Sequence, residues 1–550
     1  MTTSRALSNR QIIQAAAVVL LGFLASGVLG LVRTAAFSAA FGTSAELDAF
    51  YAAQRIPEML FTLVAGGALG SSFIPVFSRY LSANDLDGAW RLASAVMTLS
   101  ALAAAVLAVL LALFAPVLVP VLLVPGATNA EQALTTSLTQ LMLVTTVIFA
   151  ISGLLMGILN AHQRFLFPAL ALSLNNVGLI IGALILTRLL PAQAVIVPSV
   201  FDGLSTSEML IWSPSHHVNI YGLALGAVLG ATLHLLIQLP GVFGIKARLR
   251  LLVNWRVPGT LEVLGLMGPR VLGLAVVQIN FVVNIAFASA MVEGSQTALQ
   301  TAWFLMFFTL GVIAQSVGTA VFPSLSALAA ENDIAGYKGR LSTALRSVLF
   351  FAFPASIGLI LLGEPAIAVL FERGAWTSES TQATAWALNF LAIGIAGHSL
   401  LEVLSRAFYA LSDTWTPVRI GIASMVSNIV LSFVFIQFIG DPLSLARGPF
   451  AGLALANSVT TLLEGAALWW LLRRRIGDIQ DRYVLDGAVR ALVAALGMGV
   501  VIWLIGQVMT SALTWMLVGG IVGSVSFFGL AILLRLEEVS IVTRRLVRRR

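Results

Sequence analysis

Residues 70–88, GSSFIPVFSRYLSANDLDG, recur without a gap at residues 318–336 as GTAVFPSLSALAAENDIAG, an offset of 248 residues. The two copies share a glycine, a proline, a serine and a closing Asn-Asp-x-x-Gly. In each copy an apolar helix that contains the proline runs into a polar loop, and the Asn-Asp-x-x-Gly can start the next helix. The sequence therefore predicts an internal repeat with parallel topology, and transporters commonly place their substrate between such repeats.

The composition predicts the class of protein in which this repeat lies. Of the 550 residues, 59% are hydrophobic and only 10% are charged, whereas soluble domains carry about 25% charged residues. Apolar runs of about 20 residues, the length that crosses a bilayer, predict an all-α polytopic membrane protein with about fourteen transmembrane helices. The predicted spans are 11–33, 48–76, 92–118, 132–160, 167–190, 220–244, 258–291, 298–325, 345–371, 381–411, 417–439, 449–472, 487–508 and 512–534.

The basic residues predict the orientation of these spans. Of the 31 lysines and arginines, 24 fall in segments on one side of the membrane and three on the other. Because cytoplasmic loops are enriched in basic residues, both termini are expected in the cytoplasm. The first apolar run is too long for a signal peptide and is expected to remain as a helix. The chain has no cysteine, so disulfides and thiolate metal sites are excluded.

Four arginines fall inside the predicted spans: Arg33, Arg55, Arg270 and Arg406. A charge at the centre of a bilayer costs at least ~2.5–3.5 kcal/mol, so such residues usually face an interior cavity or an ion partner. They are the candidates for function. The alternative is that each one reaches the membrane surface or pairs with a carboxylate, for which the candidates are Asp48, Glu58 and Glu402.

Glycine and proline cluster in the second and eighth spans, as in RIPEMLFTLVAGGALGSSFIP at 55–75. Broken helices are tolerated in membranes only against protein or a water-filled cavity, so these two spans are expected to be bent and to line a cavity. Close helix packing through small residues is the alternative.

Sequence patterns for several enzyme classes are absent. The chain contains no G-x-x-x-x-G-K-[ST], no H-E-x-x-H and no G-x-S-x-G. The adjacent pair His216 and His217 is typical of a solvated loop rather than a metal site. The net charge of +7 is explained by the topology and does not indicate a nucleic acid partner. The sequence therefore favours transport over catalysis, with no bound metal.

Several motifs, taken in order, resemble a known family. They are GLVRTAAFSAAFGTSAELDAFYAAQRIPEML at 30–60, GSSFIPVFSRY at 70–80, VFPSLS at 321–326, LFERGAWT at 370–377 and RAFYALSDTWTPV at 406–418. Together they resemble the MurJ/MviN family of lipid II flippases, part of the multidrug/oligosaccharidyl-lipid/polysaccharide exporter superfamily. The resemblance extends from about residue 11 to residue 535.

The resemblance implies an architecture and an activity. Two six-helix lobes, 11–246 and 258–474, would surround a central cavity. A C-terminal helix pair at 485–535 would form a lipid groove, followed by a basic cytoplasmic tail at 536–550. Such a protein would lie in the bacterial inner membrane. By alternating access it would move an undecaprenyl-linked peptidoglycan precursor, lipid II, from the inner to the outer leaflet during cell-wall synthesis.

The resemblance also assigns residues. Arg33 occupies the place of an essential arginine of the first helix, with Thr34 where the family has an acid. Asp48 and Arg55 match an aspartate and a basic residue of the family. Arg270 is an additional cation. We therefore expect Arg33, Arg55, Arg270 and Asp48 to bind the substrate. The chain departs from the family where other cavity side chains are expected, with Gly27, Phe61 and Phe304 at arginine positions and Gly66 at a glutamate position.

Three functions remain open at this stage. A flippase would need no cofactor, because moving an anion outward is downhill by ~2.3 kcal/mol per charge per 100 mV. An exporter of another lipid-linked glycan or a small amphiphile would couple to protons or sodium through Asp48, Glu58 or Glu402. Asp413 could join a sodium site by family analogy, although a helix cap explains it equally well. A non-transporting paralogue would assist envelope assembly. The expected partners are a lipid-linked anionic glycan, membrane lipids and cell-wall synthesis proteins.

Overall fold

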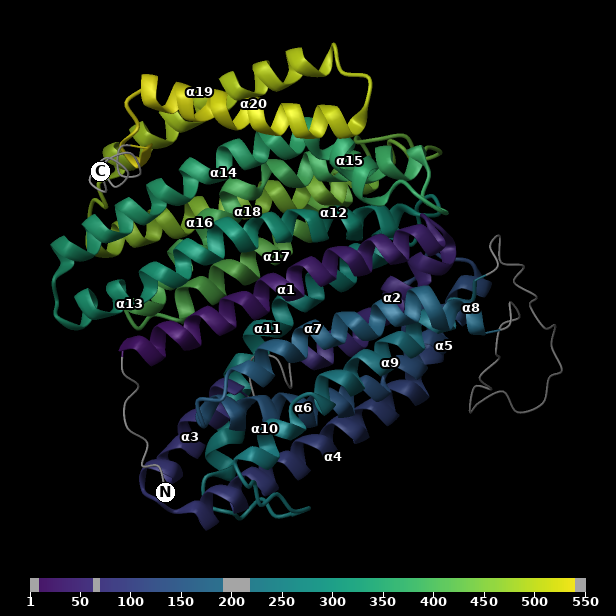
Figure 1. The fold of residues 1–550 in the computed structure, drawn as a ribbon, viewed down its shortest axis with the longest axis vertical. Helices are drawn as coiled ribbons and strands as arrows, with labels where there is room; N and C mark the ends of the chain where they lie inside the picture. Colours follow the sequence, from purple (N-terminus) through teal and green to yellow (C-terminus); the bar gives the residue numbers. More distant parts are fainter. Residues whose placement is uncertain (1–8, 63–69, 191–217, 540–550) are drawn as a thin grey trace. The chain divides into compact units, whose positions relative to one another are not determined.

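The structure is a computed structural model that describes residues 9–62, 70–190 and 218–539. Within these ranges the side chains of 9–20, 70–71 and several positions between 268 and 277, Arg270 included, are outside the description. Every regular element in the described part is helical (Figure 1). The chain divides into two compact units, 1–290 and 291–550.

The first unit contains the helices up to α11. They are α1 (Asn9–Phe41), α2 (Ala45–Leu60), α3 (Gly70–Ser82), α4 (Leu86–Leu118), η2 (Val119–Leu123), α5 (Asn129–Met142), α6 (Val144–Ala161), α7 (Leu166–Ile181), η3 (Gly182–Leu186), α8 (Thr187–Leu189), α9 (Tyr221–Leu236), α10 (Leu239–Gly244) and α11 (Thr260–Ala288).

The second unit contains the remaining helices. They are α12 (Ser295–Leu310), η4 (Gly311–Gln315), α13 (Ser316–Ala330), α14 (Ile334–Phe371), α15 (Ser378–Ile393), α16 (Ile395–Ala410), α17 (Trp415–Phe435), α18 (Phe450–Ile476), α19 (Asp481–Gly506) and α20 (Ala512–Leu533).

The described helices are those of a multi-pass membrane protein. Eleven are long and apolar enough to cross a membrane, and α15 with α16 makes a twelfth if this pair, bent by 46°, is one span. These twelve coincide with twelve of the predicted spans. The other two, 48–76 and 258–291, include residues or side chains outside the description, so the count of about fourteen stays a prediction.

The division into units places α11 with the first unit, where it packs against α2, α3 and α4. The repeat and the resemblance instead place residues 258–291 at the start of the second lobe. The predicted lobes at 11–246 and 258–474 therefore remain an interpretation of the repeat, and the compact units are a separate observation.

The repeated Asn-Asp-x-x-Gly has the same geometry in both units. Asn84 and Asn332 have φ of 58° and 57°, a left-handed conformation that asparagine tolerates better than most residues. The next residue, Asp85 or Asp333, caps the following helix by accepting a hydrogen bond from the backbone N–H of a glycine, at 2.8 Å in the first copy and 2.9 Å in the second. The motif therefore starts α4 and α14, as the sequence predicts.

The repeated aspartate also explains the glycine of the motif. A Cβ on Gly88 would lie 2.2 Å from Asp85 Oδ2, and a Cβ on Gly336 would lie 2.2 Å from Asp333 Oδ2. Because no larger side chain fits beside the capping carboxylate, the glycine is retained in both copies.

The eighth span is irregular without being broken. α12, η4 and α13 form one continuous apolar helix of 36 residues that passes through the π-helical turn at Gly311–Gln315. A bend of 46° separates α15 from α16, in the tenth predicted span. In the second span, residues 63–69, with Gly66 and Gly67, lie outside the described residues.

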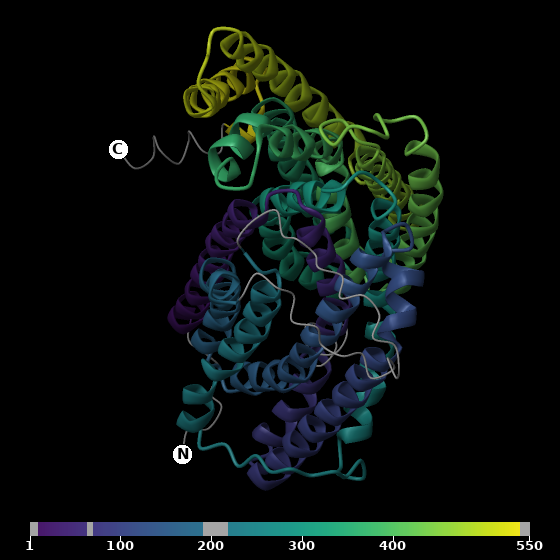
Figure 2. The ribbon, with the colours of Figure 1, turned by 90° about the vertical axis from the view of Figure 1, so that its right-hand side faces the viewer.

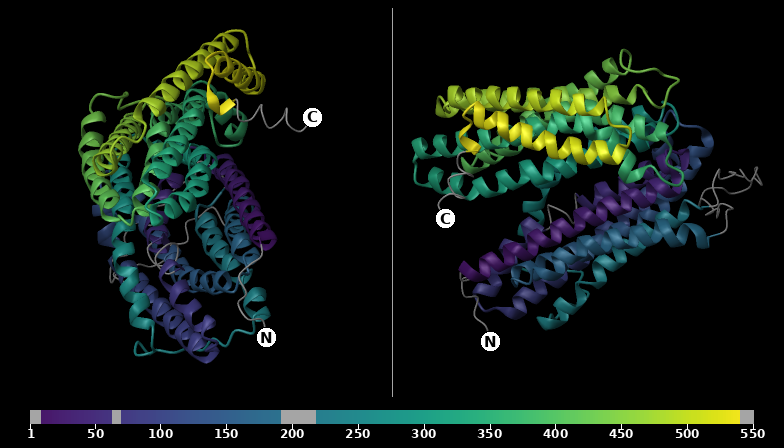
Figure 3. Two further views of the ribbon diagram at one scale, coloured as in Figure 1. Left: turned by 90° about the vertical axis from the view of Figure 1, so that its left-hand side faces the viewer. Right: turned by 45° about the horizontal axis from the view of Figure 1, so that its top comes forward.

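In the first unit, α1 lies alongside α7, which packs closely on α9 (Figure 3). The approach of α7 to α9 depends on glycines, since a Cβ on Gly178 would lie 2.3 Å from Gly230 Cα and one on Gly182 would lie 2.7 Å from Gly226 Cα. In the second unit, α19 and α20 form a helix pair that packs on α14 (Figure 2).

Candidate functional site

Arg33 lies on α1 and is half-buried. Its Nη1 donates a hydrogen bond of 3.1 Å to Oδ1 of Asn176 on α7, and its guanidinium lies 5.9 Å from the centre of the Phe37 ring. Asn176 is itself held by Ser26, because its Nδ2 donates to the backbone and hydroxyl oxygens of that residue. This network orients Arg33 through a neutral amide, which does not cancel its positive charge.

Arg55 lies on α2 and is buried, with 7% of its surface exposed. It donates one hydrogen bond to Oε1 of Gln278 on α11 and another, of 3.2 Å, to Glu58 Oε2. The guanidinium stacks over the ring of Phe281 at 4.1 Å, a cation–π contact. Its Nε has no hydrogen-bond partner in the described part of the chain. The Nε–H of this buried guanidinium is therefore an unused donor among the described residues.

Arg33, Arg55 and Glu58 form a group that we call the cationic cluster. Arg33 lies within electrostatic range of Glu58 and of Tyr51, and Glu58 is about half-exposed and paired with Arg55. Two guanidiniums therefore share one carboxylate among these side chains. The two guanidiniums are charge-assisted donors of the kind that binds anionic groups.

Asp48 lies in the first turn of α2, close to the positive end of the helix dipole. Tyr51 is within electrostatic range of both Asp48 and Arg33, so Asp48 lies near the cationic cluster. Arg270 lies within α11, but its side chain is outside the described residues. Its predicted role in substrate binding stays a prediction.

The fourth intramembrane arginine, Arg406 on α16, is paired with Glu402 one turn earlier on the same helix. Both side chains are partly exposed, at 25% and 31%. A Cβ on Gly318 of α13 would lie 2.2 Å from Arg406 Nη1, so the glycine of the repeat gives Arg406 its space. Arg406 therefore has the carboxylate partner that is expected if this arginine has a structural role instead of a role in binding.

Asp413 lies just before α17 and has the contacts of a capping residue. It accepts hydrogen bonds from the backbone N–H of Thr416 at 3.0 Å and from its hydroxyl at 2.8 Å, and it forms an ion pair with Arg475. Burial alone would raise the pKa of Asp413, but the hydrogen bonds from Thr416 and the charge of Arg475 lower that pKa below its ordinary value. An ionised carboxylate in this position supports the capping interpretation, and its predicted role in ion coupling stays a prediction.

The aromatic departures from the family pattern lie just after α2 and on α12. Phe61 follows α2 and packs against Phe149 of α6, with 4.4 Å between ring centres. Phe304 lies on α12 and is half-buried. At Phe61 an aromatic contact therefore occupies the space that the resemblance assigns to a charge, and Gly27 on α1 contributes no side chain at all.

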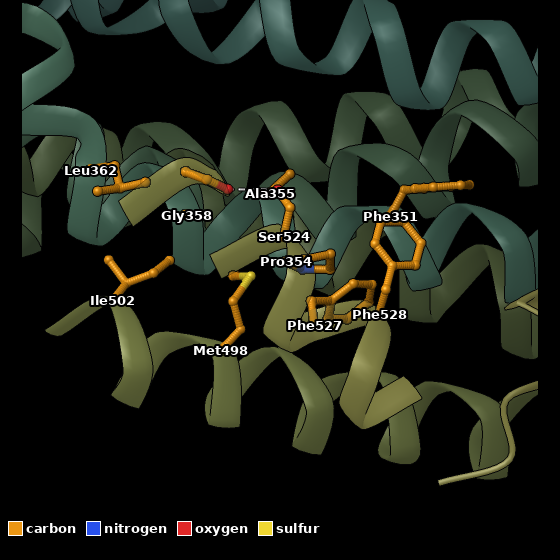
Figure 4. Close-up of a pocket in the computed structure, with 11 residues that line it drawn as sticks. Phe351, Pro354, Ala355, Gly358, Leu362, Met498, Ile502, Ser524, Phe527 and Phe528 are labelled. Atoms are coloured by element: carbon orange, nitrogen blue, oxygen red, sulfur yellow. Dashed lines mark hydrogen bonds between the residues drawn. The ribbon is translucent and has the colours of Figure 1, made fainter. Parts of the chain in front are cut away.

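An apolar pocket of about 270 Å³ lies between α14, α19 and α20 (Figure 4). Phe351, Pro354 and Leu362 of α14 face Met498 and Ile502 of α19 across it, and aromatic side chains of α20 close one end. Such a lining fits a hydrocarbon chain. The resemblance had assigned a lipid groove to this helix pair.

Sequence reasoning missed Glu464 on α18. It is the one acidic residue between Phe450 and Arg473 and has no basic residue within a turn of it. The structure places it against Gly421 and Ser424 of α17, with Ser424 as a hydrogen-bond partner. In the sequence, the only signal is an acidic residue within an apolar run. The contacts with Gly421 and Ser424 could not be predicted, because these residues belong to another helix.

Comparison with known proteins places this fold in a family. The family model described as lipid II flippase MurJ matches residues 37–522. The chain belongs to this family. Its curated relatives include the lipid II flippase MurJ of Burkholderia cenocepacia, 31% identical over 458 residues that cover 82% of each chain. The probable lipid II flippase MurJ of Vibrio cholerae is 29% identical over 520 residues, 92% of this chain and 90% of the relative.

Solved structures agree with this assignment. A lipid II flippase MurJ in an inward closed conformation matches with a TM-score of 0.74 and 25% identity, and covers 96% of this chain and 99% of that one. An inward-facing multidrug resistance transporter of the MATE family has a TM-score of 0.63 at 16% identity, covering 83% of this chain and 95% of that one. The second match shows a shared fold only.

Proposed function

We propose that this chain is a flippase that moves lipid II, an undecaprenyl-linked peptidoglycan precursor, from the inner to the outer leaflet by alternating access. The observation that carries the proposal is the match of the lipid II flippase family model to residues 37–522, nearly the whole chain. The coverage of the Burkholderia and Vibrio relatives, at 82% and 92% of this chain, supports it.

In this proposal the cationic cluster binds the pyrophosphate of the cargo. A pyrophosphate needs charge-assisted donors in a site sheltered from water, and arginine provides two parallel donors. Arg33 is held by the amide of Asn176, and Arg55 is held by the amide of Gln278 and the carboxylate of Glu58. Arg270 would add a third cation from α11. Asp48 would act indirectly, near Tyr51 and Arg33.

The apolar pocket between α14, α19 and α20 would hold part of the undecaprenyl chain. Its lining is almost entirely hydrocarbon and aromatic, with Ser524 as the one hydroxyl side chain among its residues. Burying hydrocarbon there is favourable by ~0.8 kcal/mol for each methylene removed from water. A chain of isoprene units matches this chemistry.

The membrane potential would drive the export. Moving an anion out of an inside-negative cell is downhill by ~2.3 kcal/mol per charge per 100 mV, so the proposal requires no nucleotide, metal or enzymatic step. The protein would lie in the bacterial inner membrane with both termini in the cytoplasm, where it would supply lipid II to the enzymes of cell-wall synthesis.

The proposed orientation can be tested by cysteine labelling, since the chain has no cysteine of its own. Ser82, the last residue of α3, and Ser378, the first residue of α15, are both exposed. In intact cells an impermeant thiol reagent should label Ser378→Cys and leave Ser82→Cys unlabelled. Labelling of Ser82→Cys alone would reverse the proposed orientation.

The proposed activity is tested by replacing an essential lipid II flippase with this chain in a depletion strain. We expect growth and normal cell shape with the natural chain, and lysis with Arg33→Ala expressed in the membrane at the same level. Lysis with the natural chain, correctly inserted, would count against lipid II as the cargo.

A further inference from the structure

The chain between α10 and α11, residues 245–259, contains no helix and lies along α4. The backbone N–H of Arg250 donates a hydrogen bond to Ser94 Oγ, and that of Leu252 donates to Thr98 Oγ1, each at 3.0 Å. Residues four apart on a helix are separated by ~6 Å along its axis, and residues two apart span ~6.6 Å in an extended strand. The spacing of the two hydroxyls therefore holds residues 250–252 in an extended conformation.

The extended segment is fixed on both sides of these two hydrogen bonds. Arg248 forms an ion pair of 3.4 Å with Asp87 in the first turn of α4. The Tyr80 hydroxyl of α3 donates a hydrogen bond of 2.9 Å to the carbonyl oxygen of Pro258. A partner would therefore meet an edge that is already ordered, and its binding would cost little additional conformational entropy.

The edge that points away from α4 is open. In an extended strand the backbone groups of alternate residues point to opposite sides, so those of the odd-numbered residues point away from α4. In the described part of the chain, no hydrogen bond is made by the backbone N–H or C=O of Leu249, Leu251 or Val253. An edge of this kind is a template for pairing with another chain.

The side chains along this edge are apolar or basic. Leu251, Val253 and Trp255 are 89%, 68% and 60% exposed, and exposed apolar residues that lie together often mark an interaction site. Residues 241–259 contain four basic residues and no acidic one. A complementary partner therefore presents apolar side chains together with carboxylates.

We propose that residues 249–253 are a docking edge, to which an extended acidic segment of another protein adds as a strand. The backbone of the partner pairs with the open N–H and C=O groups, and its alternate side chains supply specificity. Apolar side chains of the partner cover Leu251 and Val253, and its carboxylates pair with Arg250 and Arg256. In the proposed orientation this edge faces the cytoplasm.

The open backbone favours a protein over a lipid surface as the occupant. A lipid has no strand with which to complete the hydrogen bonds of the edge, and unpaired backbone groups are not tolerated against hydrocarbon. A basic segment with an exposed tryptophan would also suit anionic headgroups, which makes such a surface the competing occupant. The two differ in the surroundings of Leu251, which are aqueous until a peptide binds in the first case and lipid in the second.

The inference goes beyond the proposed transport activity. Residues 249–253 belong neither to the cationic cluster nor to the apolar pocket. Docking therefore requires no cargo, and docking and lipid II transport can fail separately.

The test is a fluorescence anisotropy titration of the purified full chain, in discs of zwitterionic phosphatidylcholine, with a labelled short peptide of alternating valine and glutamate. We expect saturable binding. Methylation of alternate backbone nitrogens of the peptide should abolish it, because the methyl groups remove strand donors and leave the charge unchanged. This comparison uses the natural chain and does not depend on the folding of a variant.

Two variants locate the site on the chain. Leu251→Pro removes one open N–H, and proline is tolerated on an edge strand, so binding should weaken roughly 2- to 10-fold, the effect of one hydrogen bond. Arg250→Glu should weaken binding by about fivefold or more, since it replaces an ion pair with a repulsion. Arg340→Glu makes the same change of charge at an exposed position of α14, and it should bind the peptide as the natural chain does.

Several results would overturn the proposal. They are the absence of saturable binding to the natural chain, equal binding of the methylated peptide, unchanged binding by Leu251→Pro, and equal losses in Arg250→Glu and Arg340→Glu. Peptide binding without lipid II transport by the same protein would count against the flippase and leave the docking edge standing.

The competing lipid surface is tested with a spin label at Leu251→Cys, which would be the one cysteine of the chain. In vesicles of anionic phosphatidylglycerol we expect the label to be relaxed by an aqueous nickel complex and protected from it by the peptide. Relaxation by dissolved oxygen instead would place the label in lipid and would identify the membrane as the occupant of this edge.

Discussion

The arginines of the two units differ in the partners that hold them. In the first, Arg33 and Arg55 share Glu58, and their other partners are the neutral amides of Asn176 and Gln278. In the second, Arg406 is neutralised by Glu402, and Glu464 adds a further carboxylate. The first set therefore has two arginines in the neighbourhood of Glu58 and Asp48, and the second has one arginine in the neighbourhood of two carboxylates.

The difference shows how one repeated architecture can support two chemistries. The capping motif that starts α4 and α14 is the same in both units to within 0.1 Å in its hydrogen bond. The amide partners of Arg33 and Arg55 come from other helices, whereas the carboxylate partner of Arg406 lies on its own helix. The amide of Asn176 does not neutralise Arg33, whereas the carboxylate of Glu402 neutralises Arg406.

The largest expected effect is that of Arg33→Ala. Loss of a charged hydrogen bond costs ~1.5–3 kcal/mol, which lowers transport roughly 10- to 150-fold at 1.4 kcal/mol per factor of ten. Arg33→Lys should recover only part, since lysine lacks the bidentate fork. Vesicle transport assays with equal amounts of folded protein measure the effect. Loss of the folded protein itself in Arg33→Ala would indicate a structural ion pair instead.

A smaller effect is expected from Asn176→Asp, which gives Arg33 the kind of partner that Arg406 has. The side chain keeps its size, but the added carboxylate competes with the anionic cargo. An ion pair of this type contributes about 1 kcal/mol, or roughly fivefold in lipid II affinity. Asn254→Asp, in an exposed loop, adds the same charge elsewhere and is the control. If Asn176→Asp binds lipid II as tightly as the natural chain, the kind of partner that holds Arg33, amide or carboxylate, does not affect cargo binding.

A comparable loss is expected from filling the apolar pocket. Gly520 lines it, and a Cβ there meets open space, so Gly520→Leu should occupy the groove without distorting α20. Each displaced methylene of the cargo costs ~0.8 kcal/mol, about fourfold in affinity. Gly529→Leu lies on the same helix, also in open space but outside the pocket lining, and should bind lipid II normally. Equal binding by both variants would exclude this groove as the lipid site.

The smallest effect concerns the shared motif. Asp85→Ala and Asp333→Ala should each lower the free energy of unfolding by about 1 kcal/mol, the usual contribution of a capping residue. Thermal unfolding in detergent measures it. Because the two caps have the same geometry, the two losses of free energy should be equal. Clearly unequal losses would mean that the two caps differ in stability although their hydrogen bonds have the same geometry.

The sequence predicted what depends on neighbouring residues. The caps at Asp85 and Asp333 and the apolar spans come from contacts within a few positions, and so does the pair Arg406–Glu402, which the sequence offered only as an alternative. It could not predict the partners of Arg33 and Arg55, which lie 143 and 223 residues away on α7 and α11. Glu464 was missed for the same reason, since its contacts with Gly421 and Ser424 join two helices.

The central claim is that the positive charge of the cationic cluster binds the pyrophosphate of lipid II. The most direct measurement is a binding titration of the purified chain with lipid II and, as a control, with the uncharged undecaprenyl alcohol. We predict that Arg33→Ala weakens lipid II binding at least tenfold, that added salt weakens binding to the natural chain, and that the alcohol binds both forms equally. Equal binding of lipid II to the natural chain and to Arg33→Ala would contradict the claim.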